Sequence, residues 1–304
     1  MKKLERDFVK LLDIKRNEAL DLIDRAIFLK KLRKDGVEYR PLKDKSLAMI
    51  FEKASTRTRV SFEVGIRELG GYGVVMNASD TQLGRGEPVK DTARVLSRYV
   101  DAIMIRTYSQ EIIEELAQWA SIPVINGLSD SYHPCQILSD LCTIKEFKGN
   151  LDDVKVAYIG DGNNVANSWI EASVLLGLNF SIATPEDYQP EKALLRKASK
   201  NNAFTYTDNP FDAVKDADVV NTDVWVSMGQ EQEKEKRKKA FKSYKIDDKL
   251  LKRAKKDVIV MHCLPAYRGQ EITESVFERF QETIFTQAEN RLHAQKALLE
   301  WLIK

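Results

Sequence analysis

Residues 46–70 read SLAMIFEKASTRTRVSFEVGIRELG, and this stretch joins two kinds of hydrophobic pattern. Its beginning, residues 47–51, is an unbroken apolar run, which is typical of a short strand covered on both faces. Further on, Phe62, Ile66 and Leu69 recur at helical spacing. The stretch therefore predicts a strand, a polar turn and a helix, the repeating unit of a parallel α/β sheet.

The turn itself is dense in hydrogen-bond donors, with the order Ser55, Thr56, Arg57, Thr58 and Arg59. At a helix N-terminus the first backbone N–H groups lack intrahelical partners, and the helix dipole adds partial positive charge. Hydroxyl and guanidinium groups placed there suit a phosphate or another oxyanion. The alternative is that Ser55 or Thr56 only caps the helix and the arginines are solvated, because such caps are common.

The composition is that of an ordinary globular chain. A length of 304 residues suggests about two domains. With 48 basic and 46 acidic residues the net charge is +2, so no global field favours nucleic acid or a membrane. Charges interrupt the amino-terminal apolar positions, which argues against a signal peptide, and no stretch approaches the ~20 apolar residues of a membrane span. Three cysteines give no disulfide framework, so we expect a cytoplasmic protein.

Strand and helix patterns alternate along the chain, and a polar link at 148–153 separates two series. We expect residues 4–33 to be helical and an α/β fold of two doubly wound parallel-sheet domains with helices on both faces. The expected domains are residues 1–134 and 148–288, joined by a helix at 135–147. A C-terminal helix at 289–304 is expected to cross back to the first domain.

Two features of the first domain have two possible interpretations each. Arg106 ends an apolar run at 102–107, where it is either a paired structural cation or a clamp for a ligand, since open α/β sheets bind ligands at strand ends. The segment 79–88 contains Gln82, two glycines and a proline. It is either a surface loop or a lid or subunit-bridging loop that contributes to binding.

The sequence His133, Pro134, Cys135, Gln136 precedes a helix expected at 137–147. A His-Pro pair fixes the backbone that enters the helix, and it places an imidazole and a carboxamide at the same N-terminus. Cys135 and Cys142 with His133 superficially suggest a metal site. A fourth ligand is missing and the thiols lie on different helix faces, so we expect no metal.

The strongest competing motif is Gly-x-Gly at 160–162, which follows a strand and precedes a helix. With the acidic residues at 186–187 it is similar to a dinucleotide-binding fingerprint. The third position is Val165, which hinders the close contact between helix and strand that this fingerprint needs.

Other residues of the second domain suit an amino acid better than a nucleotide. Asn163 and Asn164 offer donors and acceptors for a carboxylate and an ammonium group. Asp223 ends a strand at 218–223, where its charge suits a cationic substrate. The run at 231–242, EQEKEKRKKAFK, predicts a solvated helix with local ion pairs and no function.

Five motifs resemble, in order, the signatures of the aspartate/ornithine carbamoyltransferase family, and together they span nearly the whole chain. They are Phe51-x-Lys53-x-Ser55-Thr56-Arg57-Thr58-Arg59, His133-Pro134-x-Gln136, Asp223-x-x-x-Ser227-Met228-Gly229, His262-Cys263-Leu264-Pro265, and the start of the C-terminal helix with Arg291. The third and fourth motifs are similar to those of the ornithine-type members. Gln82 stands in a loop where aspartate-type members usually carry a lysine.

The resemblance implies transfer of the carbamoyl group of carbamoyl phosphate to the δ-amine of L-ornithine, giving L-citrulline and phosphate in arginine biosynthesis or breakdown. It implies that residues 1–134 bind carbamoyl phosphate, residues 148–288 bind ornithine, and catalysis involves Arg57, Arg106, His133, Cys263 and Asp223. Carbamoyl phosphate contacts fall on Ser55, Thr56, Arg57, Thr58, Gln82, Arg106, His133, Pro134, Cys135, Gln136, Cys263, Leu264 and Arg291. Ornithine contacts fall on Asn164, Asp223, Ser227 and Met228.

The resemblance also implies no metal and no organic cofactor, and a homotrimer or a multiple of trimers. Three alternatives remain open from the residues. The first is a carbamoyltransferase for another amine, aspartate or putrescine. The second is an NAD-dependent dehydrogenase, which depends on the Gly160 turn alone. The third is a phosphate-binding protein without catalytic activity.

Overall fold

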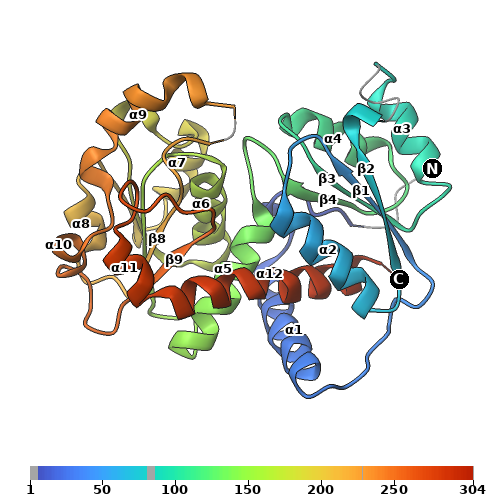
Figure 1. The fold of residues 1–304 in the computed structure, drawn as a ribbon, viewed down its shortest axis with the longest axis horizontal. Helices are drawn as coiled ribbons and strands as arrows, with labels where there is room; N and C mark the ends of the chain where they lie inside the picture. Colours follow the sequence, from blue (N-terminus) through green and yellow to red (C-terminus); the bar gives the residue numbers. More distant parts are fainter. Residues whose placement is uncertain (1–5, 81–85, 228, 304) are drawn as a thin grey trace. The chain divides into compact units, whose positions relative to one another are not determined.

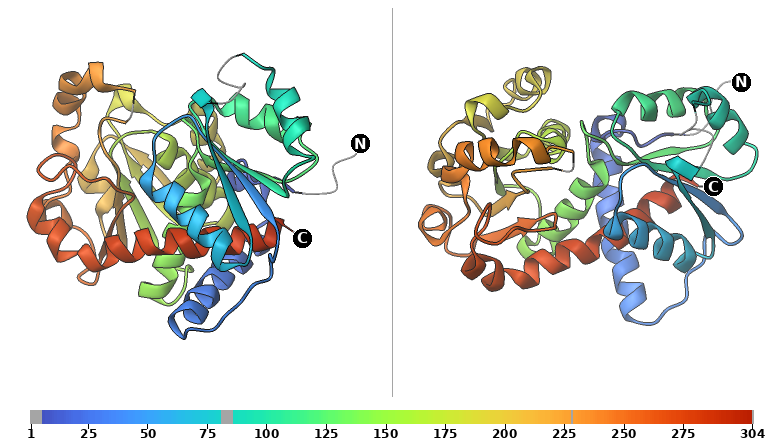
Figure 2. Two further views of the ribbon diagram at one scale, coloured as in Figure 1. Left: turned by 45° about the vertical axis from the view of Figure 1, so that its right-hand side comes forward. Right: turned by 45° about the horizontal axis from the view of Figure 1, so that its top comes forward.

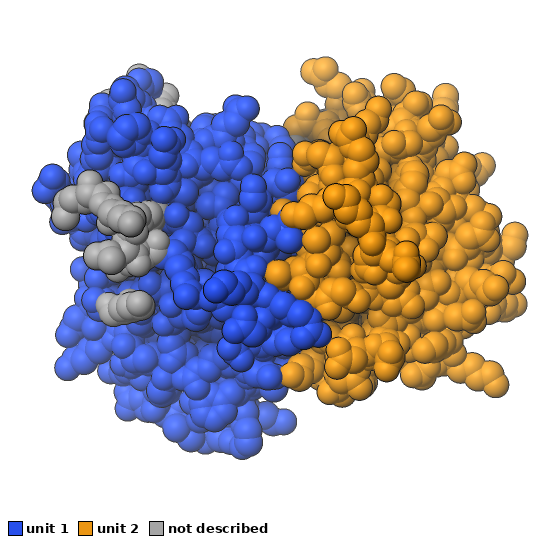
Figure 3. Space-filling model, turned by 180° about the vertical axis from the view of Figure 1, so that it is seen from behind, with its two compact units in different colours: residues 1–142, 290–304 blue, residues 143–289 orange. Residues whose placement is uncertain are grey.

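The computed structural model describes residues 6–80, 86–227 and 229–303, and these form two compact units. Unit 1 comprises residues 1–142 and 290–304, and unit 2 comprises residues 143–289 (Figure 3). The division falls inside two helices, α5 (Pro134–Lys148) and α12 (Gln281–Leu302). Each of these helices therefore begins in one unit and ends in the other.

Unit 1 is built on a sheet of four parallel strands in the order β2-β1-β3-β4 (Figure 1). The strands are β1 (Ser46–Phe51), β2 (Tyr72–Asn77), β3 (Ala102–Arg106) and β4 (Val124–Leu128). The chain runs from β1 outward to β2 and then returns to the other side of β1 as β3. The strand order thus reverses between β1 and β3, where open α/β sheets form their ligand crevice.

Helices cover both faces of this sheet (Figures 1 and 2). Ala48 and Ile50 of β1 belong to an apolar cluster that includes residues of α3 and α4, whereas Met49 points to the face on which Ile66 of α2 packs. The helices are α1 (Arg16–Lys34), α2 (Thr56–Glu68), α3 (Val89–Leu96) and α4 (Gln110–Trp119). The strand, turn and helix predicted for residues 46–70 are present as β1 and α2.

The amino-terminal segment differs from the expectation that residues 4–33 are helical. The described part begins extended, because Phe8 forms a parallel bridge with Ile125 of β4. A short 3-10 helix, η1 (Leu11–Asp13), follows, and α1 begins only at Arg16. Burial of Phe8 against the sheet overrides the helical pattern of its neighbours.

Unit 2 contains five parallel strands in the order β7-β6-β5-β8-β9. They are β5 (Lys155–Ile159), β6 (Asn179–Ala183), β7 (Phe204–Thr207), β8 (Val219–Thr222) and β9 (Ile259–His262). Here the order reverses between β5 and β8. The sequence prediction of two parallel-sheet α/β domains is therefore confirmed.

Both faces of the second sheet are covered as well. On one face Trp169 of α6 stacks on Phe180 of β6 with ring centroids 5.8 Å apart, and on the other α8 packs against β5, β6 and β7. The helices are α6 (Asn164–Leu176), α7 (Lys192–Ala198), α8 (Pro210–Val214), α9 (Lys234–Ala240), α10 (Asp248–Leu251) and α11 (Glu274–Arg279). Within the described ranges, no helix is both long and apolar enough to span a membrane.

Candidate active site in two halves

The turn after β1 presents its side chains in two directions. Ser55 is the N-cap of α2, and its hydroxyl accepts a hydrogen bond of 3.2 Å from the Thr58 amide. Arg57 is half-buried, whereas Arg59 is exposed and faces Glu63 one helical turn away. Ser55 therefore caps the helix, and the two arginines of the motif are not equivalent.

Two further arginines converge on this turn. Arg106 ends β3 directly opposite Phe51 of β1, on the two strands where the order reverses, and its Nη1 lies 3.4 Å from the Thr58 hydroxyl oxygen. Arg291 of α12 donates to the same oxygen from Nη2 at 3.1 Å. Both side chains are buried, so two guanidinium groups meet at the N-terminus of α2. An oxyanion there would be held by fixed positive groups.

The first turn of α5 completes this half. Gln136 accepts a hydrogen bond of 2.7 Å from Nη1 of Arg291 and donates one of 2.7 Å to Asp140. The pKa of His133 lies well below its usual value, mainly because the ring is buried and also because Arg291, Arg106 and Arg57 are positively charged. His133 is therefore a neutral imidazole near pH 7, able to donate a hydrogen bond without adding charge.

The two cysteines of this region contact backbone carbonyl oxygens. The thiol of Cys135 donates to the carbonyl oxygen of Asn126 at 3.4 Å, and burial raises its pKa to about 12. Cys142 contacts the carbonyl oxygen of Ile23 at 3.9 Å. Because a thiol must lose its proton to bind zinc, these contacts argue against the metal interpretation of His133, Cys135 and Cys142. Pro134 is the first residue of α5.

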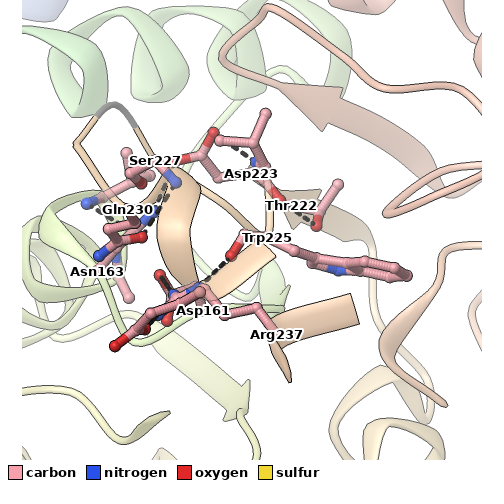
Figure 4. A network of polar contacts seen from close by, with 12 residues as sticks. Asp161, Asn163, Thr222, Asp223, Trp225, Ser227, Gln230 and Arg237 are labelled. Carbon is pink, nitrogen blue, oxygen red and sulfur yellow. Dashed lines mark hydrogen bonds and ion pairs between the residues drawn. The ribbon is translucent and has the colours of Figure 1, made fainter. Parts of the chain in front are cut away.

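Asp223, directly after β8, is the centre of the second half (Figure 4). Its Oδ1 accepts from the Cys263 thiol at 2.9 Å and from the Val224 amide at 2.7 Å, and its Oδ2 accepts from Asn163 Nδ2 at 2.7 Å. Asp223 is 6% exposed, and the three donors hold its carboxylate in one orientation. A buried carboxylate fixed in this way suits an ammonium group that loses its water shell.

Asn163 has a role that the sequence did not assign. Its Oδ1 caps α6 by accepting from the amides of Val165 at 3.0 Å and Ala166 at 3.2 Å, which aims its amide group at Asp223. Asn164, the residue expected to bind ornithine, is the half-buried first residue of α6. Asn163 therefore positions Asp223, and Asn164 is its neighbour in the chain at the N-terminus of α6.

The same turn is unsuited to a dinucleotide. A Cβ added to Gly162 would lie 2.3 Å from the backbone nitrogen of Pro190, so the protein's own chain occupies the space that a pyrophosphate would need. The Gly162 amide donates to the carbonyl oxygen of Tyr188 at 3.0 Å, and Asn163 caps the next amides. These contacts argue against the dehydrogenase interpretation.

The loop after Asp223 and the turn after β9 carry the remaining predicted residues. Ser227 and Gln230 close a tight turn, because the Ser227 amide donates to Gln230 Oε1 at 3.1 Å and the Gln230 amide donates to the Ser227 carbonyl oxygen at 3.1 Å. Half-buried Leu264 donates from its amide to His262 Nδ1 at 2.9 Å. Met228 and Gln82 lie outside the described residues.

Asp223, His262 and Cys263 bring one possible metal ligand each within 4.8 Å of one another. Both ring nitrogens of His262 already have partners, since Nδ1 accepts from Leu264 and Nε2 lies 3.2 Å from Glu271. The imidazole is therefore held by the protein, and three groups are one fewer than a tetrahedral structural site needs.

Sequence reasoning missed a buried ion pair between Asp161 and Arg237. Burial raises the pKa of Asp161 to about 7, although the charge of Arg237 opposes this shift. The expectation of a fully solvated helix at 231–242 is wrong in this respect, because Arg237 of α9 faces inward. One signal was available: Arg237 is the sole arginine of that run, and arginine is preferred in buried ion pairs.

Family comparisons agree with this arrangement. Residues 6–146 match the model of the aspartate/ornithine carbamoyltransferase carbamoyl-P binding domain, and residues 152–302 match that of the Asp/Orn binding domain. The chain belongs to the aspartate/ornithine carbamoyltransferase family. Arg291 falls within the second match, yet in the structure it lies in unit 1 beside Thr58.

Relatives of this carbamoyltransferase chain cover nearly its whole length. An ornithine carbamoyltransferase from Oceanobacillus iheyensis is 54% identical over 98% of this chain and 94% of its own, and one from Methanoculleus marisnigri is 52% identical over 99% and 97%. The solved ornithine carbamoyltransferase of Pyrococcus furiosus superposes with a TM-score of 0.94 at 50% identity, covering 98% of this chain and 97% of its own. The anabolic enzyme of Campylobacter jejuni gives 0.91 at 46% identity, with 98% of both chains covered.

Proposed function

We propose that this carbamoyltransferase acts on L-ornithine, forming L-citrulline and phosphate from ornithine and carbamoyl phosphate. The observation that carries the proposal is Asp223, a buried carboxylate held by three donors where the strand order of unit 2 reverses. A negative group there attracts a cationic amino acid and repels the extra carboxylate of aspartate. The full-length relatives named ornithine carbamoyltransferase support the same choice.

In unit 1 the proposed ligand is carbamoyl phosphate. Arg57, Arg106 and Arg291, with Thr58 and the N-terminus of α2, would hold the phosphate. His133, as a neutral imidazole, would donate to the carbonyl oxygen where negative charge develops. Such fixed donors stabilise a transition state because they need no reorganisation.

In the reaction, the lone pair of the ornithine δ-nitrogen forms a bond to the carbonyl carbon. The bond from that carbon to the phosphate oxygen breaks, phosphate leaves with the electron pair of that bond, and the nitrogen loses one proton, which is released to solvent. An amine of this kind is mostly protonated at neutral pH, so the rate should rise with pH until the δ-amine is neutral. Cys263 and Asp223 are the groups proposed to orient that amine.

Assembly and location are also proposals. We infer a homotrimer or a multiple of trimers, in which the loop with Gln82 serves a neighbouring subunit's site. A cytoplasmic location fits the three cysteines, none of which forms a disulfide within the described residues. Arginine metabolism is the corresponding physiological setting.

A panel of amines tests the proposed substrate. Purified protein and carbamoyl phosphate are incubated with L-ornithine, L-aspartate or putrescine, and the carbamoylated product is quantified. Ornithine should give kcat/KM at least about a hundredfold above the other two, since mispairing or omitting a buried charge costs several kcal/mol. A preference for aspartate or putrescine would replace the proposal, and no product from any amine would favour a binding protein.

A further inference from the structure

Arg237 is a buried cation in a helix that is otherwise charged and exposed. The helix α9 has the sequence KEKRKKA, and its lysines and glutamate lie at the surface or half-buried, but the Arg237 side chain is 5% exposed. Burying a guanidinium group costs several kcal/mol unless partners replace its water. The contacts of Arg237 therefore indicate its role.

The guanidinium group contacts three separate segments, and Figure 4 labels two of its partners, Asp161 and Trp225. Its Nη2 forms an ion pair with Asp161, and its Nε donates to the carbonyl oxygen of Trp225 at 2.6 Å. Its Cζ lies 4.6 Å from the centroid of the Tyr188 ring, within the range of a cation–π interaction. One side chain thus satisfies a carboxylate, a backbone carbonyl and an aromatic face.

These partners follow three adjacent strands of the sheet. Asp161 comes two residues after β5, Tyr188 ends the short 3-10 helix η4 (Glu186–Tyr188) that follows β6, and Trp225 comes three residues after β8. The reversal of strand order lies between β5 and β8. Arg237 therefore joins the loops that surround the binding end of unit 2.

Those loops carry the groups proposed to bind ornithine. Trp225, whose carbonyl oxygen Arg237 holds, lies between Asp223 and Ser227 in the chain. Asp161 lies two residues before Asn163, whose amide group donates to Asp223. Any movement of Arg237 would be transmitted to Asp223 through the backbone of both loops.

We infer that Arg237 is a positioning residue for ornithine: paired with Asp161, it fixes the loops that place Asp223 and Ser227. The inference rests on the proposed function. The inference adds to the residues that would touch ornithine a residue, Arg237, that acts by positioning them. Apart from Cys263 and Leu264, the residues expected to contact carbamoyl phosphate lie in unit 1, whereas the contacts of Arg237 lie in unit 2, so we expect the effect to fall mainly on ornithine.

Lysine cannot replace this arrangement. A guanidinium group donates from Nε and Nη2 in fixed, diverging directions and stacks flat on an aromatic ring, whereas an ammonium group is a single point of charge. Arg237→Lys can keep the ion pair or the carbonyl contact but not both with the same geometry. The rise in the KM for ornithine in Arg237→Lys should therefore be smaller than in Arg237→Met.

The test is the KM for each substrate in Arg237→Met, Arg237→Lys and Asp161→Asn, assayed at pH 8, above the pKa of about 7 of Asp161. Arg237→Met should raise the KM for ornithine about tenfold to a hundredfold, the range expected when hydrogen bonds to a charged group are lost. The KM for carbamoyl phosphate should change less than about twofold. The matched control Lys238→Met removes a charge from the same helix that pairs only locally with Glu235, and it should leave both constants unchanged.

The double variant Asp161→Asn/Arg237→Met separates positioning from bulk stability. If the two residues act as one unit, the double variant should be no worse for ornithine than Arg237→Met alone. If Arg237→Met does not fold, Asp161→Asn alone tests the inference, and a rise in the KM for ornithine without a rise in the KM for carbamoyl phosphate supports it. The inference is overturned if folded variants keep the wild-type KM for ornithine, or if both KM values rise together with a fall in Tm. Wild-type turnover of ornithine is measured in parallel, and its absence would contradict the proposed function instead.

Discussion

The thiol of Cys263 donates a hydrogen bond to the carboxylate of Asp223, with 2.9 Å between Sγ and Oδ1. Cys263 follows β9 and Asp223 follows β8, two neighbouring strands of unit 2. Asn163, from the loop after β5, donates to the other carboxylate oxygen. Groups at three strand ends thus hold one carboxylate in place, and we propose that the substrate preference depends on it.

Asp223→Asn should raise the KM for ornithine at least about tenfold. The variant loses the negative charge, and its amide N–H would face the side-chain amide of Asn163, which is also a donor. Asn163 cannot turn its amide to compensate, since its Oδ1 caps α6. Steady-state kinetics with both substrates checks this, with Asp187→Asn, an exposed residue of η4, as the control of equal charge. An unchanged KM for ornithine would show that the ammonium binds elsewhere.

The two arginines of the turn after β1 should differ in effect. Arg57→Met should lower kcat/KM by about a hundredfold or more, because it removes a fixed cation beside the proposed phosphate position. Arg59→Met removes an exposed cation that faces Glu63 at 3.8 Å, and it should stay within about twofold of wild type. Equal losses in the two variants would contradict the assignment of the phosphate to Arg57.

The buried histidines of unit 1 should make the fold sensitive to acid. Burial, with Lys296, Lys30 and Arg33 nearby, lowers the pKa of His293 to about 3, and the pKa of His133 is also lowered. Above pH 6.5 the folded and unfolded states are both neutral at these rings. As the pH falls from 6.5 toward 3, the unfolded state binds protons that the folded state does not, so stability is lost.

His293→Gln should therefore show a flatter dependence of the free energy of unfolding on pH. The difference in slope between pH 6 and pH 4 should be at most about 1.4 kcal/mol for each pH unit. Urea denaturation at several pH values measures it. Parallel curves for wild type and variant would contradict a neutral, buried His293.

Gly162→Ala should disturb the ornithine half more than the rest of the protein. The added Cβ would meet backbone atoms of the segment 188–190, the nearest at 2.3 Å, and backbone cannot rotate away. We expect a Tm lower by several degrees and a higher KM for ornithine, because Asn163 is the next residue. Gly65→Ala, whose Cβ meets the Lys296 side chain at 3.3 Å, should leave the KM for ornithine unchanged.

The fold could be predicted because its signals are local. The apolar run of β1 and the helical spacing of Phe62 and Ile66 identify strand and helix without knowledge of the rest of the chain. The local pattern predicts a helix at Phe8. Its extended conformation depends on pairing with Ile125, which lies 117 positions away in the chain, and no local pattern reveals such a pairing. Tertiary burial outweighed local periodicity there.

For the candidate site, the sequence identified candidate residues but not the role of each. Asn163 and Asn164 are the same residue type at adjacent positions, and only the cap of α6 shows that Asn163 is the one whose side chain turns toward Asp223. Arg237 was read as solvated because its neighbours are charged. Its ion pair with Asp161 spans 76 residues and depends on the strand order of unit 2, which composition does not encode.

The formation of the new bond tests the central proposal most directly. Carbamoyl phosphate labelled with ¹³C and ornithine labelled with ¹⁵N at the δ-nitrogen are mixed with the protein and followed by ¹³C NMR. The account predicts that the carbonyl signal becomes a doublet through direct carbon–nitrogen coupling, with one phosphate released for each doublet formed. Release of phosphate with no coupled signal, or labelled carbamoyl phosphate that stays intact beyond its spontaneous decay, would contradict it.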